Sequence, residues 1–124
     1  ILYQSISLDG GYPDENQRFD NVVYADAVLG DLAASLLVMR EKMLSRDDLV
    51  GAVFIGGMDG VEVEYGIFKR LHPNAVILPV AAAGGAALNL ARDKGYFSGP
   101  ELEDVDFATL FNRHLSSQLP IKQN

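Results

Sequence analysis

Apolar residues occur in short runs separated by glycine- and proline-rich breaks, a pattern typical of alternating strands and helices. Short β-branched and aromatic runs predict strands, which cover residues 1–7, 21–25, 50–55 and 75–80. Segments with apolar residues every three or four positions predict helices, which cover residues 30–45, 61–71, 86–94 and 106–117. This order predicts an α/β domain, with a parallel sheet, right-handed crossovers and helices on both faces.

Two other stretches have the polar composition of surface loops. Residues 8–20 are rich in Gly, Pro, Asp and Asn and show no periodicity. Residues 95–105 lead into the last predicted helix, and we interpret the acidic run there as a solvated loop rather than a site. Its acids are Glu101, Glu103, Asp104 and Asp106. The predicted strand 50–55 is apolar throughout, which favours a strand covered on both faces.

Length and composition favour one globular domain over residues 1–124, because 48% of its 124 residues are hydrophobic. The chain has no cysteine, which excludes zinc-ribbon, iron–sulfur and thiol-nucleophile chemistry and fits a reducing cytoplasm. No apolar run approaches the roughly 20 residues that span a bilayer. The chain begins at Ile1 inside a predicted strand, so we expect further strands of this domain upstream.

The net charge of −7 opposes binding to nucleic acid and to anionic membranes. It also repels a phosphorylated small molecule at long range, so a phosphate site has to act locally, through backbone amides and a few cations. The residues suggest no metal site and no cofactor. The remaining partner class is a small-molecule ligand.

Two turns rich in small residues follow the second pair of predicted strands. Gly56, Gly57, Met58, Asp59 and Gly60 lie between the strand 50–55 and a helix. Gly84 and Gly85 follow the strand 75–80 in the same way. Glycines let the backbone approach a ligand, and a helix N-terminus offers unpaired amides to an anion at the carboxyl edge of a parallel sheet. The alternative is a pair of tight turns that hold no ligand.

Two charged residues occupy apolar helix faces. On a helical wheel of about 100° per residue, Arg40 falls within the apolar stripe that runs from Leu29 to Leu44, and Glu64 falls among the inward residues of the next helix. A buried charge needs a partner, so we expect both to reach toward the first glycine turn and to interact. A structural ion pair between two helices is the alternative interpretation.

Residues 39–65 (MREKMLSRDDLVGAVFIGGMDGVEVEY) resemble the core of the LOG family within the SLOG (SMF/DprA-LOG) superfamily. In that family an arginine on a helix precedes a GGxGTxxE turn. Here Arg40 lies sixteen residues before Gly56, and Glu64 is the glutamate. The turn has the extra residue Asp59, and Val61 replaces the threonine. The resemblance covers about residues 1–97 and implies a Rossmann-like, nucleotide-binding α/β fold whose first strands and first glycine loop are absent from this chain.

This variant turn looks more like the SLOG domains of bacterial defence and signalling proteins. The resemblance implies a sensor of an NAD-derived or ADP-ribose-like nucleotide, in a homo-oligomer and with a fused effector domain. The alternative it implies is a LOG-like phosphoribohydrolase that cleaves the base from nucleoside 5′-monophosphates, with Arg40 and Glu64 as catalytic residues. A structural or oligomerisation module without a ligand is the third possibility.

The loop 8–20 contains further candidates for ligand contact. Asp9, Asp14 and Glu15 are candidates for binding ribose hydroxyls, with simple solvent exposure as the alternative. Tyr12 and Phe19 either stack on a base or anchor the loop.

The last predicted helix carries Phe107, Leu110 and Phe111 on one side, typical of packing on the sheet, with docking on a second subunit as the alternative. His72 and His114 lie near helix ends, where solvated or capping roles are expected.

Overall fold

The computed structural model describes residues 1–6 and 11–116. The chain divides into two compact units, Ile1–Asp47 and Asp48–Asn124, and each is described by itself. Asp9 and residue 117, the predicted end of the last helix, lie outside the described residues.

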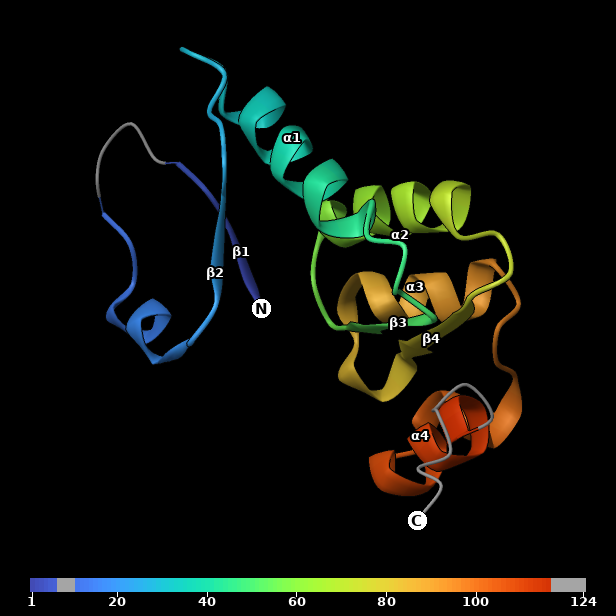
Figure 1. Ribbon diagram of the computed structural model, residues 1–124. Helices are drawn as coiled ribbons and strands as arrows, with labels where there is room; N and C mark the ends of the chain where they lie inside the picture. Colours follow the sequence, from blue (N-terminus) through green and yellow to red (C-terminus); the bar gives the residue numbers. More distant parts are fainter. Residues whose placement is uncertain (7–10, 117–124) are drawn as a thin grey trace. The chain divides into compact units, whose positions relative to one another are not determined.

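The first unit is a parallel strand pair joined to one helix. Strand β1 (Leu2–Ser5) pairs with β2 (Val22–Ala25), and α1 (Leu32–Leu44) follows β2 and contacts both strands (Figure 1). The Asp31 side chain begins α1 by accepting a hydrogen bond of 2.9 Å from the Ala34 backbone N–H. Between the strands the chain forms a 3-10 turn at Asp14–Arg18.

The second unit repeats the strand–helix order twice and adds a last helix. Strand β3 (Gly51–Ile55) and β4 (Val76–Val80) are parallel, with Phe54 opposite Pro79. The α-helices of this unit within the described residues are α2 (Asp59–Leu71), α3 (Gly85–Asp93) and α4 (Phe107–Leu115) (Figure 1). The predicted Rossmann-like α/β class with parallel strands is confirmed.

The core of the second unit joins its last strand to the helices that follow. Leu78 on β4 is fully buried. It packs with Ala91 of α3, with Phe97 of the segment after α3, and with Leu110 of α4. Burial of Leu110 in this cluster confirms that α4 packs on its own unit, as its apolar side predicts. Phe68 of α2 is 1% exposed.

The prediction that β3 is covered on both faces is wrong. Phe54 is 7% exposed, whereas its neighbours Val53 and Ile55 are 39% and 63% exposed. Successive side chains of a strand point to opposite faces, so this alternation is typical of a strand covered on one face. The sequence does not reveal this difference, because apolar and polar side chains do not alternate along a run that is apolar throughout.

The prediction that the apolar stripe of the first helix faces inward is also wrong in part. Leu29 and Leu32 are 86% and 75% exposed, and Leu37 is exposed as well, while Leu44 is buried. Leu29 precedes the cap residue Asp31, so it is not on the helix at all. A two-stranded sheet is too narrow to cover a helix of 13 residues.

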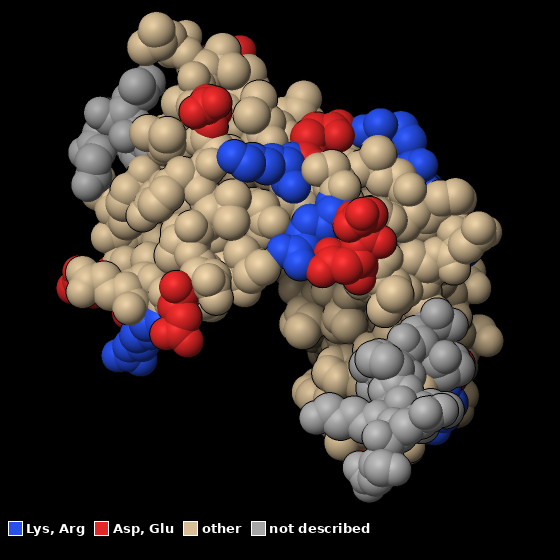
Figure 2. Space-filling view, in the orientation of Figure 1, with Lys and Arg blue, Asp and Glu red and all other residues tan. Residues whose placement is uncertain are grey.

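None of the helices in the described residues combines the length and the apolar character that crossing a bilayer requires. Figure 2 shows Lys and Arg side chains lying directly beside Asp and Glu side chains on the face that it draws. Charges of opposite sign therefore neighbour each other there.

Candidate functional site

The first glycine turn connects β3 to α2 and depends on left-handed backbone. Gly56 and Gly57 have φ of 60° and 82°, values that favour glycine. A Cβ on Gly57 would also collide with the side chain of Val61, the residue that stands at the threonine position of the LOG pattern. The helix begins at Asp59, two residues earlier than predicted, so Asp59 and Gly60 form the first turn of α2 rather than part of the loop.

The second glycine turn joins β4 to α3 and lies directly against the first. Gly84 precedes the helix with φ of 71°, and Gly85 begins it with φ of 59°. The Ala86 backbone N–H donates to the Gly57 carbonyl at 3.0 Å, and the Ala87 N–H donates to the Gly56 carbonyl at 3.0 Å. A Cβ on Gly85 would lie 2.5 Å from the Gly57 carbonyl oxygen, closer than side chains approach backbone. The sequence predicted two turns at one edge, and the structure brings them into backbone contact.

A hollow of about 470 Å³ opens where the two turns meet, and we call it the glycine-turn hollow. Most of the predicted turn residues line it: Gly57, Met58, Asp59, Gly60 and Gly85. Sequence reasoning missed its other lining residues, which are Glu62, Ala86 and Asn89. Asn89 had a weak signal in the sequence, because it is a polar residue between Leu88 and Leu90.

The chemistry of the glycine-turn hollow combines backbone amides with carboxylates. No side chain caps the N-terminus of α2, and the Val61 N–H bonds the Met58 carbonyl at 2.9 Å. The preceding first-turn amides of α2 thus lie at an uncapped, positive helix end. Asp59 and Glu62 place negative charge in the same turn. At α3, by contrast, the Ala86 and Ala87 amides are already used by the first glycine turn.

Arg40 and Glu64 lie in different units, on α1 and α2, and both are half-buried. Around Glu64 the inward face of α2 is as predicted, with Tyr65 and Phe68 buried. Exposed Glu62 points away from that face and lines the hollow. The expected meeting of Arg40 with Glu64 stays a prediction.

The first unit has its own hollow of about 410 Å³ near the ends of β1 and β2, lined by Ser5, Tyr12, Asp31 and Ser35 among others. The Tyr12 hydroxyl donates to the Ser5 carbonyl at 3.3 Å, and its ring centroid lies 6.1 Å from that of Tyr24. These contacts anchor the loop through Tyr12. Within the same loop, Asp14, Glu15 and Phe19 are exposed.

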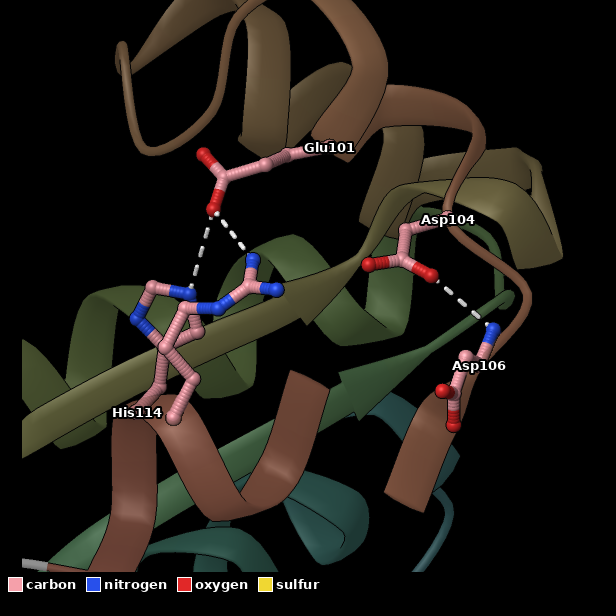
Figure 3. Close-up of polar contacts among 5 residues, drawn as sticks. Glu101, Asp104, Asp106 and His114 are labelled. Atoms are coloured by element: carbon pink, nitrogen blue, oxygen red, sulfur yellow. Dashed lines mark hydrogen bonds and ion pairs between the residues drawn. The ribbon is translucent and has the colours of Figure 1, made fainter. Parts of the chain in front are cut away.

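Members of the acidic run between α3 and α4 have structural roles (Figure 3). The Glu101 carboxylate lies 3.1 Å from Arg113 Nη1 and 3.5 Å from His114 Nε2. Asp104 accepts a hydrogen bond from the Asp106 backbone N–H at 2.9 Å. The prediction of a plain loop is wrong in part, because Glu101 and Glu103 lie in a 3-10 helix (Gly99–Glu103), and the Glu101 carboxylate contacts α4.

His72 likewise lies at a helix end, where it caps the C-terminus of α2 and packs on Phe68 with ring centroids 4.9 Å apart.

Asp106 makes the stability of α4 sensitive to acid. Its side chain accepts hydrogen bonds from the Thr109 hydroxyl at 2.6 Å and from the Thr109 N–H at 3.1 Å, and these bonds lower the pKa of Asp106. Because the folded pKa is depressed, this stabilisation is present at neutral pH and is lost as the pH falls below about 4. Asp106→Asn is expected to flatten the acid-side fall of the unfolding free energy, measured by denaturant titration at several pH values.

Thr109→Val is the matched variant, because it removes the hydroxyl donor and leaves the carboxylate. It is expected to reduce the fall of the unfolding free energy at acid pH by a smaller amount than Asp106→Asn does. Acid-side profiles of both variants parallel to that of the unchanged protein would contradict this role of Asp106.

Among models of known protein families, that of the SLOG cluster3 family matches residues 1–115. No curated protein and no solved structure matches the chain.

Proposed function

The chain belongs to the SLOG cluster3 family, and we propose that it is a sensor domain that binds an NAD-derived or ADP-ribose-like nucleotide. Membership of a SLOG family indicates a nucleotide-related domain. The proposal adds the ligand class, and it places the ligand phosphates in the glycine-turn hollow.

The observation that carries this proposal is the joining of two glycine turns around one hollow. Four glycines with positive φ, Gly56, Gly57, Gly84 and Gly85, bring two backbone segments together without side chains between them. The uncapped first turn of α2 opens into that space. Backbone amides at a helix N-terminus bind phosphate oxygens well, and a wall of glycine lets those oxygens approach the chain.

The charge of the hollow favours one class of phosphate. Asp59 and Glu62 in the first turn of α2 repel a terminal monophosphate, which carries up to two negative charges at neutral pH. An internal pyrophosphate also carries two charges but spreads them over two phosphates, so the phosphate nearest these carboxylates bears a single charge and is repelled less. The acidic first turn therefore supports a pyrophosphate-bridged ligand, such as ADP-ribose or NAD, over AMP.

Arg40 and Glu64 are assigned the ligand contacts outside the turns. Arg40 neutralises a phosphate by charge-assisted hydrogen bonds, and Glu64 accepts hydrogen bonds from ribose hydroxyls. These roles follow the LOG-type spacing of the two residues in the sequence.

The test measures binding of AMP, ADP, NAD and ADP-ribose to the full-length protein by calorimetry. We expect ADP-ribose or NAD to bind more tightly than AMP. Arg40→Ala and Glu64→Ala are expected to weaken that binding about tenfold or more, the range for hydrogen bonds to charged groups. Arg18→Ala is the control, because Arg18 is an exposed cation of the same unit as Arg40. Unchanged affinity in folded Arg40 and Glu64 variants would overturn the assigned roles.

Chromatography of the same mixtures separates sensing from hydrolysis. A sensor returns the nucleotide intact. Release of free base from AMP would instead identify a LOG-like phosphoribohydrolase, in which Glu64 stabilises positive charge on the ribose and Arg40 orients the phosphate.

A further inference from the structure

We propose that a second cavity, between α2 and α3, binds the terminal ribose of a nucleoside diphosphate ribose whose pyrophosphate occupies the glycine-turn hollow. This inference rests on the proposed function and extends it to a sugar subsite. It makes the second sugar, rather than the nucleoside alone, the feature that the protein recognises.

The second cavity, which we call the interhelix cavity, adjoins the glycine-turn hollow. Helices α2 and α3 are neighbours (Figure 1), and the cavity between them has a volume of about 220 Å³. Its lining residues are Glu62, Tyr65, Asn89, Leu90, Asp93 and Lys94. Glu62 and Asn89 also line the glycine-turn hollow, so the two spaces share a wall. A ligand with phosphates in the hollow can extend past these two residues into the cavity.

Tyr65 is held rigidly at this cavity by its neighbours. Its ring packs edge-on against Phe54 and Tyr96, with centroids 6.0 and 6.2 Å away, and the residue is 8% exposed. Lys69 Nζ donates to the Tyr65 hydroxyl at 3.3 Å, and the Tyr96 hydroxyl lies 3.2 Å from it. With Tyr96 as donor, the Tyr65 oxygen accepts two hydrogen bonds, and its own proton is available to a ligand oxygen.

The charges around the tyrosine pair support Tyr96 as the donor. Burial, and then the hydrogen bond to Tyr65, raise the pKa of Tyr96, so Tyr96 keeps its proton. Burial also raises the pKa of Tyr65, but hydrogen bonds from Tyr96 and Lys69, with the charges of Lys69 and Lys94, outweigh it and lower that pKa overall. A phenol whose pKa is lowered donates a stronger hydrogen bond, which here would run from the Tyr65 hydroxyl to a ligand oxygen.

The donors and acceptors of the interhelix cavity match a sugar better than an ion. Glu62 and Asp93 supply carboxylate acceptors, Tyr65 and Lys94 supply donors, and the Asn89 amide supplies both. Each ribose hydroxyl both donates and accepts, so vicinal hydroxyls can use groups of both kinds. Glu62 and Asp93 disfavour a phosphate here, because this cavity lacks the uncapped N-terminus of α2, which lines the glycine-turn hollow. Lys94 with nearby Lys69 disfavours a bare cation.

The experiment compares ADP with ADP-ribose in calorimetric titrations of the full-length protein. ADP-ribose carries the terminal ribose, whereas ADP ends in a phosphate with an additional negative charge, so variants of the cavity residues isolate the effect of the sugar. ADP-ribose is expected to bind at least about tenfold more tightly than ADP, because several hydrogen bonds form only with the second sugar. Tyr65→Phe and Asp93→Asn are expected to weaken ADP-ribose binding by about threefold to tenfold each and to leave ADP binding unchanged. Both variants keep the size of the side chain, and thermal melts check their folding.

Glu103→Gln is the matched control, because Glu103 is an exposed acid in the segment that joins α3 to α4. Equal affinity for ADP and ADP-ribose would overturn the sugar subsite and leave the phosphate site standing. An equal loss of ADP and ADP-ribose binding in Tyr65→Phe would overturn it too, because the effect would not depend on the second sugar. Failure of both nucleotides to bind the unchanged protein would instead reject the proposed function itself.

Discussion

Gly85→Ala is expected to lower the unfolding free energy by about 3–5 kcal/mol, a large part of the total stability of a small domain. Gly85 has φ of 59°, where a residue with a Cβ costs roughly 1–2 kcal/mol. The added Cβ would also lie 2.5 Å from the Gly57 carbonyl oxygen and 3.1 Å from the Gly56 carbonyl carbon. Backbone atoms cannot turn aside as side chains do, so the two turns have to separate.

Separation of the turns has a second consequence for stability and for binding. It breaks the hydrogen bonds from Ala86 and Ala87 to the first glycine turn, each with a net contribution of about 1 kcal/mol. It also opens the glycine-turn hollow, so the variant is expected to lose nucleotide binding together with stability. Denaturant unfolding and calorimetry measure the two effects on the same sample.

Gly95→Ala is the matched control for this substitution. Gly95 has φ of 69°, but no atom lies within 4 Å of the position of an added Cβ. Only the backbone strain of roughly 1–2 kcal/mol applies there. Similar losses of stability in the two variants would show that contact between the turns contributes nothing.

Leu110→Ala is expected to lower the unfolding free energy by about 2–5 kcal/mol, the range for a large aliphatic side chain removed from a core. Leu110 is 1% exposed and joins α4 to the cluster formed with Leu78, Ala91 and Phe97. Removing its side chain leaves a cavity between β4, α3 and α4. Denaturant titration followed by circular dichroism measures the change.

Phe107 on the same helix supplies the control, because it is 43% exposed. Phe107→Ala is expected to change the unfolding free energy by less than about 1 kcal/mol, although it removes more atoms than Leu110→Ala. A larger loss from Phe107→Ala than from Leu110→Ala would contradict the assignment of Leu110 to the core of this unit.

The order of the elements could be predicted from the sequence because the breaks are chemically strong. The glycine turns limit where elements begin and end, and so do His72 and the proline that follows it. As a result, the strands β1 to β4 lie inside the runs predicted for them. The two glycine turns were predicted to lie at one edge because parallel strands end at the same side.

The contact between the turns was not predictable in the same way. It depends on how α3 begins, with its Ala86 and Ala87 amides directed at carbonyls some thirty residues earlier in the chain. Glu62 is exposed on α2, but its exposure does not reveal that a second helix lies opposite. Tyr65 is buried, and only its neighbours Tyr96 and Lys69 reveal a polar role.

The amide NMR spectrum of the ¹⁵N-labelled protein, recorded with and without ADP-ribose, tests the central claim most directly. A nucleotide phosphate bound between the glycine turns is expected to shift the Asp59 and Gly60 amides most, with Gly57 and Gly85 next. An unchanged spectrum at saturating ADP-ribose, or shifts confined to the first-unit hollow around Tyr12, would contradict the account.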